Sequence, residues 1–100
     1  MYLVICNAHP DHSKAIARQL VNDKLAACVN LIPNVLSFYI WKDRFVEDNE
    51  DTLLIKVRKD RYEEFEKKLT EIHPYSSPEI LAIEPTHVLD SYLKWIYEVT

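Results

Sequence analysis

The stretch that decides the fold is residues 28–58, which reads CVNLIPNVLSFYIW, then KD, then RFVEDNEDTLLIKVR. Val, Ile, Phe, Tyr and Trp crowd its first half, a composition that favours a pleated, half-buried strand. With a turn at residues 41–44, the stretch predicts one long β-hairpin. Such arms exceed the usual strand of about five or six residues, and a small domain cannot cover them with its own helices. The excess strand must pair with another surface, most simply a second copy of the chain.

Length, charge and cysteine content limit the possible classes of protein. The 100 residues suffice for one core, so we expect a single domain over residues 1–100. The formal net charge of −4 argues against broad binding of nucleic acid or of an anionic membrane. No apolar run approaches the roughly 20 residues that span a bilayer, and two cysteines are too few for a disulfide framework. We expect a cytoplasmic protein with reduced thiols.

Glycine is absent from the sequence. A Walker loop, a dinucleotide-binding G-x-G-x-x-G and a G-x-S-x-G elbow each need glycine at a positive φ or beside a ligand, so all three are excluded. No carboxylate pair and no nucleophile with an orienting triad is apparent either. We therefore expect neither an organic cofactor nor catalysis.

Strand and helix patterns alternate in the rest of the chain. We predict a strand at 2–7, helices at 12–24 and 60–72, a strand at 79–83 and a helix from residue 90. The first strand is almost wholly apolar, as in a strand covered on both faces or central in its sheet. Asp11, Asp60 and Asp90 are the expected helix caps, and Pro33 predicts a bulge in the hairpin. The last helix is apolar around most of its circumference, which predicts packing on the core and on a neighbour.

The order of elements is βαββαβ plus a C-terminal helix, which predicts an α+β fold of the ferredoxin-like type. With the sheet order 4-1-3-2, the end of the first strand, the hairpin turn and the start of the last strand share one end. Cys6, His9, Trp41 and His73 gather towards that end, whereas Cys28 lies at the other. A disulfide between the two cysteines of one chain is therefore not expected.

One group of side chains at this end suggests metal chemistry. Cys6, His9 and His12 are spaced by three residues, and the fold brings His73 towards them. Thiolate and imidazole are ligands that copper and Zn(II) select. The same spacing also fits a buried core thiol with histidines that bind nothing. A Cys–His nucleophile is a further alternative, but it lacks an orienting partner and an oxyanion donor.

Two other groups carry alternative interpretations. The acidic run at 47–51 lacks the loop length and the glycine of an EF-hand, so we expect a solvated or bulged face that blocks edge pairing. Three aromatic and three basic side chains suggest a stacking platform for bases: Tyr39, Trp41, Tyr75, Lys42, Arg44 and Arg58. The RNP signature is absent and the charge is acidic, so core or interface packing is the expected role of these aromatic rings.

Three stretches together resemble the CutA family, the divalent-ion-tolerance proteins. They are LAACVNLIPNV at 25–35, HPYSSPEI at 73–80 and YLKWI at 92–96, with the similar hairpin segment YIWKD at 39–43. Their order and spacing make the resemblance specific, and it covers almost the whole chain. It implies a ferredoxin-like protomer in a tight homotrimer, with long hairpins that join sheets across subunits. It also implies copper binding by the Cys that ends the first strand and by a His pair before Pro-Tyr.

The residues of this chain match that ligand pattern only in part. Cys6 stands at the first position and His73 at the second His, but Ile72 replaces the first His, so His9 is the available substitute. Asn34 stands where the family commonly has glycine, and asparagine tolerates the left-handed conformation best after glycine. We predict a cytoplasmic, homotrimeric metal-response protein that binds Cu(II) or another divalent cation weakly through Cys6, His73 and His9.

An alternative hypothesis is a trimeric small-molecule sensor or scaffold of the P-II type. Its inter-subunit clefts, lined by Tyr39, Trp41, Lys42 and Tyr75, would bind a metabolite or a partner. Because fold does not fix function, both hypotheses stay open at this point. Saturable metal binding favours the first, and an organic anion in the clefts favours the second.

Overall fold

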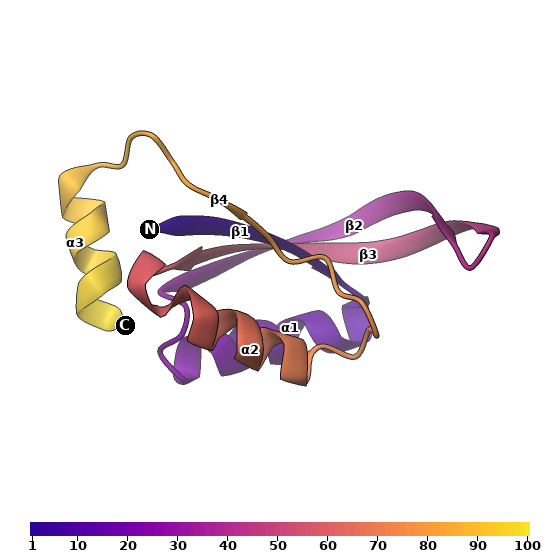
Figure 1. Ribbon diagram of the computed structural model, residues 1–100, viewed down its shortest axis with the longest axis horizontal. Helices are drawn as coiled ribbons and strands as arrows, with labels where there is room; N and C mark the ends of the chain where they lie inside the picture. The colour runs from indigo at the N-terminus through magenta and orange to yellow at the C-terminus, as the bar shows by residue number, and fades with distance from the viewer.

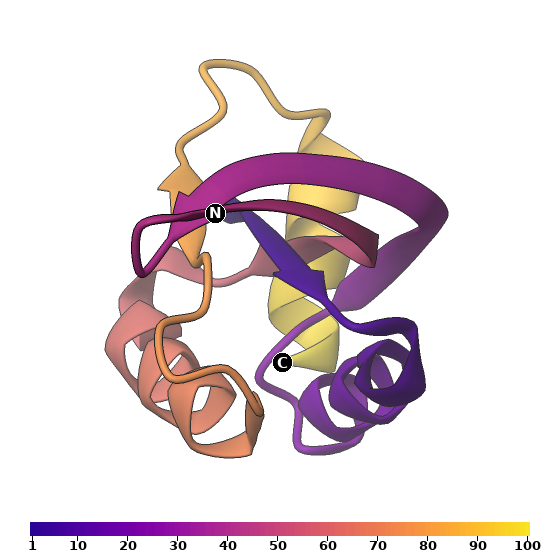
Figure 2. The ribbon, with the colours of Figure 1, turned by 90° about the vertical axis from the view of Figure 1, so that its right-hand side faces the viewer.

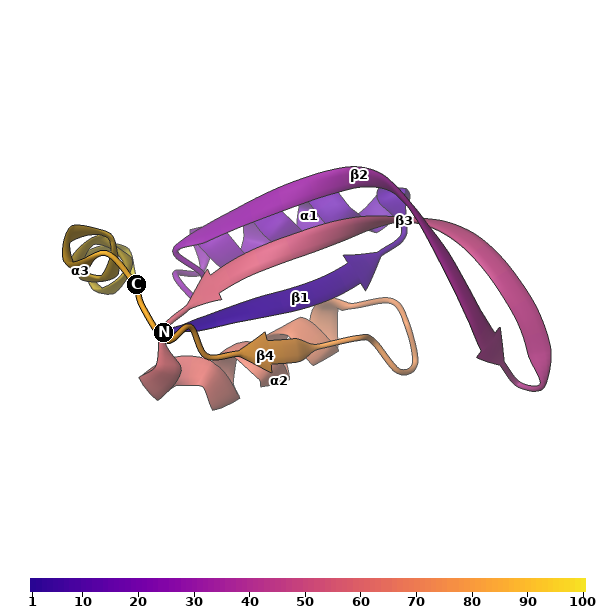
Figure 3. The same ribbon diagram turned by 90° about the horizontal axis from the view of Figure 1, so that it is seen from above.

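One antiparallel sheet organises the chain, and the computed structural model describes all of residues 1–100. The elements in chain order are β1 (Tyr2–Ala8), α1 (Pro10–Asn22), β2 (Cys28–Trp41), β3 (Arg44–Val57), the 3-10 turn η1 (Lys59–Arg61), α2 (Tyr62–Ile72), β4 (Leu81–Ile83) and α3 (Asp90–Val99). The strands lie in the order β2-β3-β1-β4, as Figure 3 shows. This confirms the predicted α+β, ferredoxin-like arrangement, and it confirms that the first strand is central.

Both long helices cover the same face of the sheet (Figure 2). Because side chains alternate along a strand, every second residue of β1 and β3 points towards these helices. The resulting core is formed mainly by Val4, Cys6, Ala8, Leu53, Ile55 and Val57 from the sheet and Ile16, Leu20, Phe65 and Leu69 from the helices. The other face of the sheet carries no helix, and the alternate residues of β1 are only half-buried.

The hairpin of β2 and β3 extends well beyond the two helices (Figure 1). Its ladder runs from the Cys28–Lys56 pair to the Trp41–Arg44 pair, and it gives the molecule a longest dimension of 45 Å. Only the inner part of β3 pairs with β1. The predicted hairpin and its turn are confirmed.

Two local irregularities shape the hairpin without any glycine. The register shifts between Ile32 and Val35, which confirms the bulge predicted at Pro33. Asn34 within this bulge has a φ of 60°, the left-handed conformation that asparagine tolerates. At the tip, Lys42 and Asp43 have φ values of 50° and 62°, the pair of positive values that a tight hairpin turn requires.

The three predicted aspartate caps are wrong, and α1 shows the first reason. Pro10 occupies the first turn of α1, and its fixed φ starts the helix before Asp11. The cap is therefore His9, whose Nδ1 accepts the backbone N–H of Asp11 at 3.2 Å.

At the other two helices the aspartates have different surroundings. The Asp60 carboxylate pairs with the Arg58 guanidinium at 2.6 Å, a charge-assisted contact that takes precedence over a neutral backbone donor. The segment 59–61 is accordingly a 3-10 turn, and α2 begins only at Tyr62. Asp90 lies inside the first turn of α3 and follows Leu89, which makes no side-chain cap.

The C-terminal part of the chain packs loosely on the rest. The strand predicted at 79–83 shortens to Leu81–Ile83. Helix α3 lies at the end of the sheet opposite the hairpin tip (Figures 1 and 3) and buries only Ile96 fully. The Arg58 guanidinium stacks over the Tyr97 ring at 4.7 Å.

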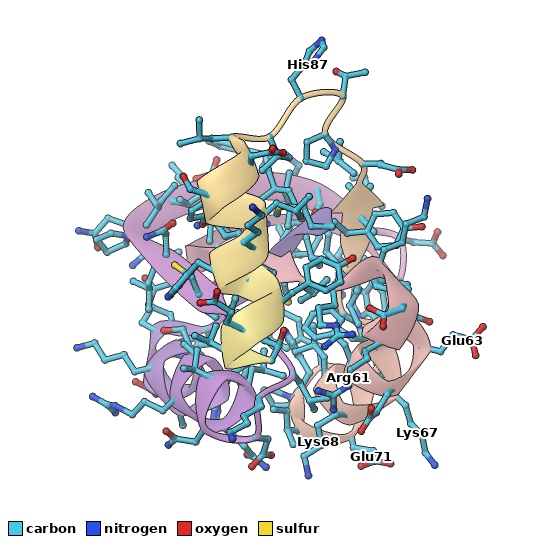
Figure 4. All side chains as sticks on the ribbon, turned by 90° about the vertical axis from the view of Figure 1, so that its left-hand side faces the viewer. Arg61, Glu63, Lys67, Lys68, Glu71 and His87 are labelled. Carbon is cyan, nitrogen blue, oxygen red and sulfur yellow. The ribbon has the colours of Figure 1, made fainter.

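Helix α2 is amphipathic, as its sequence predicts. Figure 4 shows its charged side chains pointing away from the sheet: Glu63, Lys67, Lys68 and Glu71. None of the helices has both the length and the apolar composition needed to cross a membrane.

Candidate functional site

The first predicted ligand, Cys6, faces the helices from the middle of the sheet. Its side chain is 0% exposed, and its thiol donates a long hydrogen bond to the Asn7 carbonyl at 3.7 Å. Burial raises the pKa of the Cys6 thiol to about 12, and the carboxylates of Glu79 and Glu50 contribute to the rise. The thiolate, which is the metal-binding form, is therefore disfavoured near neutral pH.

The second predicted ligand, His73, is also buried, and both of its ring nitrogens have partners. Nδ1 accepts the backbone N–H of Tyr75 at 3.1 Å, so the proton of the neutral ring lies on Nε2. Nε2 lies 2.9 Å from the Asn7 carbonyl and donates to it. No ring lone pair of His73 is left for a metal in this arrangement.

The structure brings two of the three predicted ligands together. Cys6 and His73 both donate to the carbonyl of Asn7, whereas His9 lies at the start of α1 beside Asp11 and His12. No three His, Cys, Asp or Glu side chains converge as a metal-binding group. The residues therefore do not form a preformed copper site, and the assignment of Cys6, His73 and His9 as ligands stays a prediction.

A pocket opens on the helix-free face of the sheet, between β1, the loop after α2 and the outer hairpin, by which we mean residues 33–50. Its volume is about 360 Å³, and it is lined by Asn7, Tyr39, Trp41, Asp48, Glu50, Tyr75, Ser76, Ser77 and Glu79. We call it the aromatic–acidic pocket. It contains three carboxylates and no Lys or Arg. Lys42, which the sequence placed among the lining residues, is not one of them.

Strand periodicity and one loop build this pocket. Because β-strand side chains alternate, Asp48 and Glu50 of β3 point to the same face. The loop after α2 brings Tyr75 over them, and its hydroxyl donates to the Glu50 carboxylate at 2.8 Å. The Tyr39 hydroxyl donates to Asp48 at 3.3 Å.

The acidic run is only in part the solvated face that the sequence predicts, because Glu47 is exposed and Asp48 is half-buried, whereas the other two carboxylates are buried. Glu50 and Asp51 are each only 5% exposed, because one lies under Tyr75 and the other points to the opposite face. There the Ser13 hydroxyl of α1 donates to Asp51. Buried carboxylates need such donors, and the long-range pairs that supply them are invisible in the local sequence.

The carboxylates give the pocket a negative field. Burial and then the Glu50 carboxylate raise the pKa of Tyr75 well above its usual range. Desolvation and then Asp48 raise the pKa of Tyr39. Both pKa values rise because loss of solvent and then a neighbouring carboxylate disfavour the phenolate form. Such a field attracts cations and repels anions.

Sequence reasoning found the aromatic part of this pocket but missed Asn7 and Glu79. The available signal was topological. Asn7 pairs with Thr52 across the β1–β3 ladder, and the Thr52 hydroxyl donates to the Asn7 side chain at 2.7 Å. Glu79 belongs to the same HPYSSPEI stretch as Tyr75.

Comparison with known proteins gives a consistent family. Residues 1–99 match the family described as CutA1 divalent ion tolerance protein. The chain is 38% identical over 88 residues to the divalent-cation tolerance protein CutA of Thermus thermophilus, which covers 88% of this chain and 85% of that protein. It is 34% identical over 100 residues to the protein of the same name from Pyrococcus horikoshii, with 98% and 97% covered.

Solved structures agree with the sequence comparison. The crystal structure of Pyrococcus horikoshii CutA in 3 M guanidine hydrochloride superimposes with a TM-score of 0.95 at 33% identity, and covers 100% of this chain and 99% of that chain. The apo form of the PII-like protein CutA from Nostoc sp. PCC 7120 gives a TM-score of 0.91 at 37% identity, with 95% and 92% covered. The chain belongs to the CutA1 family of divalent-cation tolerance proteins.

Proposed function

We propose that this chain is a non-catalytic cation-response protein that binds divalent cations weakly in the aromatic–acidic pocket. The observation that carries the proposal is the lining charge: Asp48, Glu50 and Glu79 without one basic side chain. Carboxylate and amide oxygens are the ligands that hard divalent cations take. Because these carboxylates do not converge into a closed cluster, a bound ion keeps several waters, and its affinity is low. The description of the family as divalent ion tolerance proteins supports the proposal of cation binding.

Copper binding by Cys6 and His73 remains the finer proposal, and the structure specifies what it requires. Cys6 must release a proton whose pKa is about 12, and His73 must give up one of its two hydrogen bonds. Because the thiolate has to form, Cu(II) affinity at this pair should rise with pH. His9 would join only after a movement of the start of α1.

Calorimetric titration of the metal-free, reduced protein with Cu(II), Zn(II) and Mn(II) tests the two locations separately. Glu79→Gln removes one pocket carboxylate, and Cys6→Ser with His73→Ala removes the thiol–imidazole pair. Glu63→Gln, on the solvent face of α2 (Figure 4), is the matched control. Weaker binding in Glu79→Gln alone supports the pocket, and weaker binding only in the double variant supports the thiol and imidazole. If all the variants bind like the wild type, direct cation binding at either location is wrong.

We propose that the chain assembles as a homotrimer. The support is the outer hairpin, where Leu36, Phe38, Ile40 and Phe45 are 55%, 59%, 66% and 65% exposed. A contiguous apolar surface of this kind marks a protein interface, and the number three comes from the family resemblance. Light scattering should give three times the 11.8 kDa chain mass. Ile40→Glu should lower this mass to that of one chain, whereas Lys67→Glu on α2 should leave it unchanged.

Two free thiols, Cys6 and Cys28, fit a reducing compartment, so we propose a cytoplasmic location. Fractionation of cells that express the tagged protein tests this directly. Recovery in the extracellular or membrane fraction would contradict the proposal.

A second candidate function is small-molecule sensing. The rings of Tyr39, Trp41 and Tyr75 all line the one pocket, and the Nostoc relative is named PII-like. The sign of the charge favours an organic cation over the organic anion that the sequence suggested, because aromatic faces and carboxylates both attract ammonium groups. Putrescine should raise the melting temperature, and Trp41→Ala should abolish the rise. A rise with glutarate instead of putrescine would contradict this charge preference.

A further inference from the structure

Two exposed histidines at the start of α1 lie outside both locations described above. His9 precedes the helix and His12 lies in its first turn. Their imidazole centroids are 6.3 Å apart, with the ring planes at 60°. The His9 side chain is 46% exposed, and His12 is exposed as well. Because the two rings are neighbours and both are accessible, rotation of the side chains can direct one nitrogen of each ring to a single ion.

A third side chain, Asp11, has the position that supports a metal-binding imidazole. Its carboxylate lies 3.5 Å from Nδ1 of His9. In the metal-free chain, Nδ1 accepts the backbone N–H of Asp11, so the ring proton lies on Nε2. If this proton moves to Nδ1, it can be donated to the Asp11 carboxylate, and the lone pair on Nε2 becomes free. Metal-binding histidines commonly donate their second N–H to a carboxylate in this way.

We propose that His9 and His12 form a two-imidazole site for Zn(II), Ni(II) or Cu(II), with Asp11 as the hydrogen-bond partner that orients His9. Water molecules complete the coordination shell. Binding changes the tautomer of His9 and releases no proton from that ring. The site differs from the Cys6–His73 pair because its imidazoles are accessible and no buried thiol has to ionise. It does not depend on the aromatic–acidic pocket and goes beyond the function proposed for it.

The test uses Zn(II) and Ni(II) chloride with the full-length, reduced protein. His12→Gln removes one imidazole. His9→Asn removes the other and keeps a side-chain oxygen that can cap α1. The matched control is His87→Gln, because His87 stands alone at the tip of the loop before α3 (Figure 4). We expect either α1 variant to weaken binding about tenfold or more, with no change in the control.

The role of Asp11 has its own readout. Nitrogen-15 NMR of the imidazoles should show the His9 proton move from Nε2 to Nδ1 when Zn(II) is added. Asp11→Asn should weaken Zn(II) binding about tenfold, while the circular dichroism of the metal-free protein stays the same. A His9 tautomer that does not respond to Zn(II) would overturn this orienting role.

The outcomes separate this site from the pocket. Affinity that falls in His9→Asn and His12→Gln but not in Glu79→Gln supports the histidine pair, whatever the result for the pocket. Affinity that is unchanged in both histidine variants overturns the pair, even if Glu79→Gln shows that the pocket binds cations. An equal loss in His87→Gln also overturns it, because any exposed imidazole would then suffice.

Discussion

The inner and outer halves of the same hairpin contrast sharply. In the inner half, Leu53, Ile55 and Val57 of β3 are 0% exposed. In the outer half, Phe38, Ile40 and Phe45 are each more than half exposed, although they are at least as apolar. The two halves share one continuous antiparallel ladder, which is interrupted only by the register shift before Val35.

The difference lies in the neighbours and not in the strands. The inner half has β1 along its edge and two helices over its face, whereas the outer half has neither (Figures 1 and 2). An isolated two-stranded ribbon is marginally stable in water. The apolar composition of a strand therefore predicts that its surface is buried. Whether the same chain or another molecule buries that surface depends on the fold.

The largest effect should come from the core of the inner half. In an Ile40→Glu background, which should prevent the proposed assembly, Leu53→Ala should lower the free energy of unfolding by about 2–5 kcal/mol because it leaves a cavity. Phe45→Ala in the same background should cost about 1 kcal/mol or less, mainly the contact with Phe38. Urea unfolding measures both variants. Equal losses would show that the two halves are packed alike.

The buried thiol of Cys6, in the strand β1 that pairs with the inner half, should make stability fall at alkaline pH. The folded pKa of Cys6 is about 12, above its ordinary value of 9.0, so the folded state holds this proton more tightly than the unfolded state. The stabilisation is complete below about pH 9 and is lost as the pH rises towards about 12. The loss is at most about 4 kcal/mol.

Unfolding free energies from pH 8 to 11 check this expectation. Cys6→Ala should flatten the decline relative to the wild type, whereas Cys28→Ser should keep it. An identical decline in Cys6→Ala would assign the alkaline loss to other groups.

Loss of the hydrogen bond between Tyr75 and Glu50, at the border of the two halves, should have an intermediate effect on stability. Tyr75→Phe leaves the buried Glu50 carboxylate without its hydroxyl donor, which should cost about 1–3 kcal/mol. Tyr39→Phe removes a longer hydrogen bond to Asp48 on an exposed residue, and should change stability by about 0.5 kcal/mol at most. Thermal unfolding would contradict the expectation if Tyr39→Phe proved the more destabilising change.

The smallest effect should be a small gain in stability from a substitution at the tip of the outer half. Asp43 has a φ of 62°, where glycine has no steric penalty. Asp43→Gly should therefore stabilise the protein by about 0.5 kcal/mol, the relief of strain exceeding the added entropy of the unfolded chain. Lys67→Gly in the exposed face of α2 should instead cost about 1 kcal/mol. A loss of stability in Asp43→Gly would mean that Asp43 makes contacts beyond its own turn.

Several features of this molecule were predictable from local sequence alone. The hairpin, the bulge at Pro33 and the amphipathic α2 follow from residue type and periodicity over a few positions. The order of the elements then limited the sheet to one familiar topology. The ends of the helices were not predictable in this way, because Pro10 and Arg58 compete with the aspartates for the same few positions.

The sequence by itself determined the strands, the helices, their order and the family. Tertiary structure alone decided which polar groups are buried and which of them have partners. In the folded chain, the Tyr75 hydroxyl donates to Glu50, the Ser13 hydroxyl donates to Asp51, and both ring nitrogens of His73 form hydrogen bonds. These contacts join residues 25 to 66 positions apart, except the one within the His73 loop, and no local pattern encodes them. Metal binding and ionisation depend on these surroundings, because burial, neighbouring charge and hydrogen bonds fix the energy of each charged form.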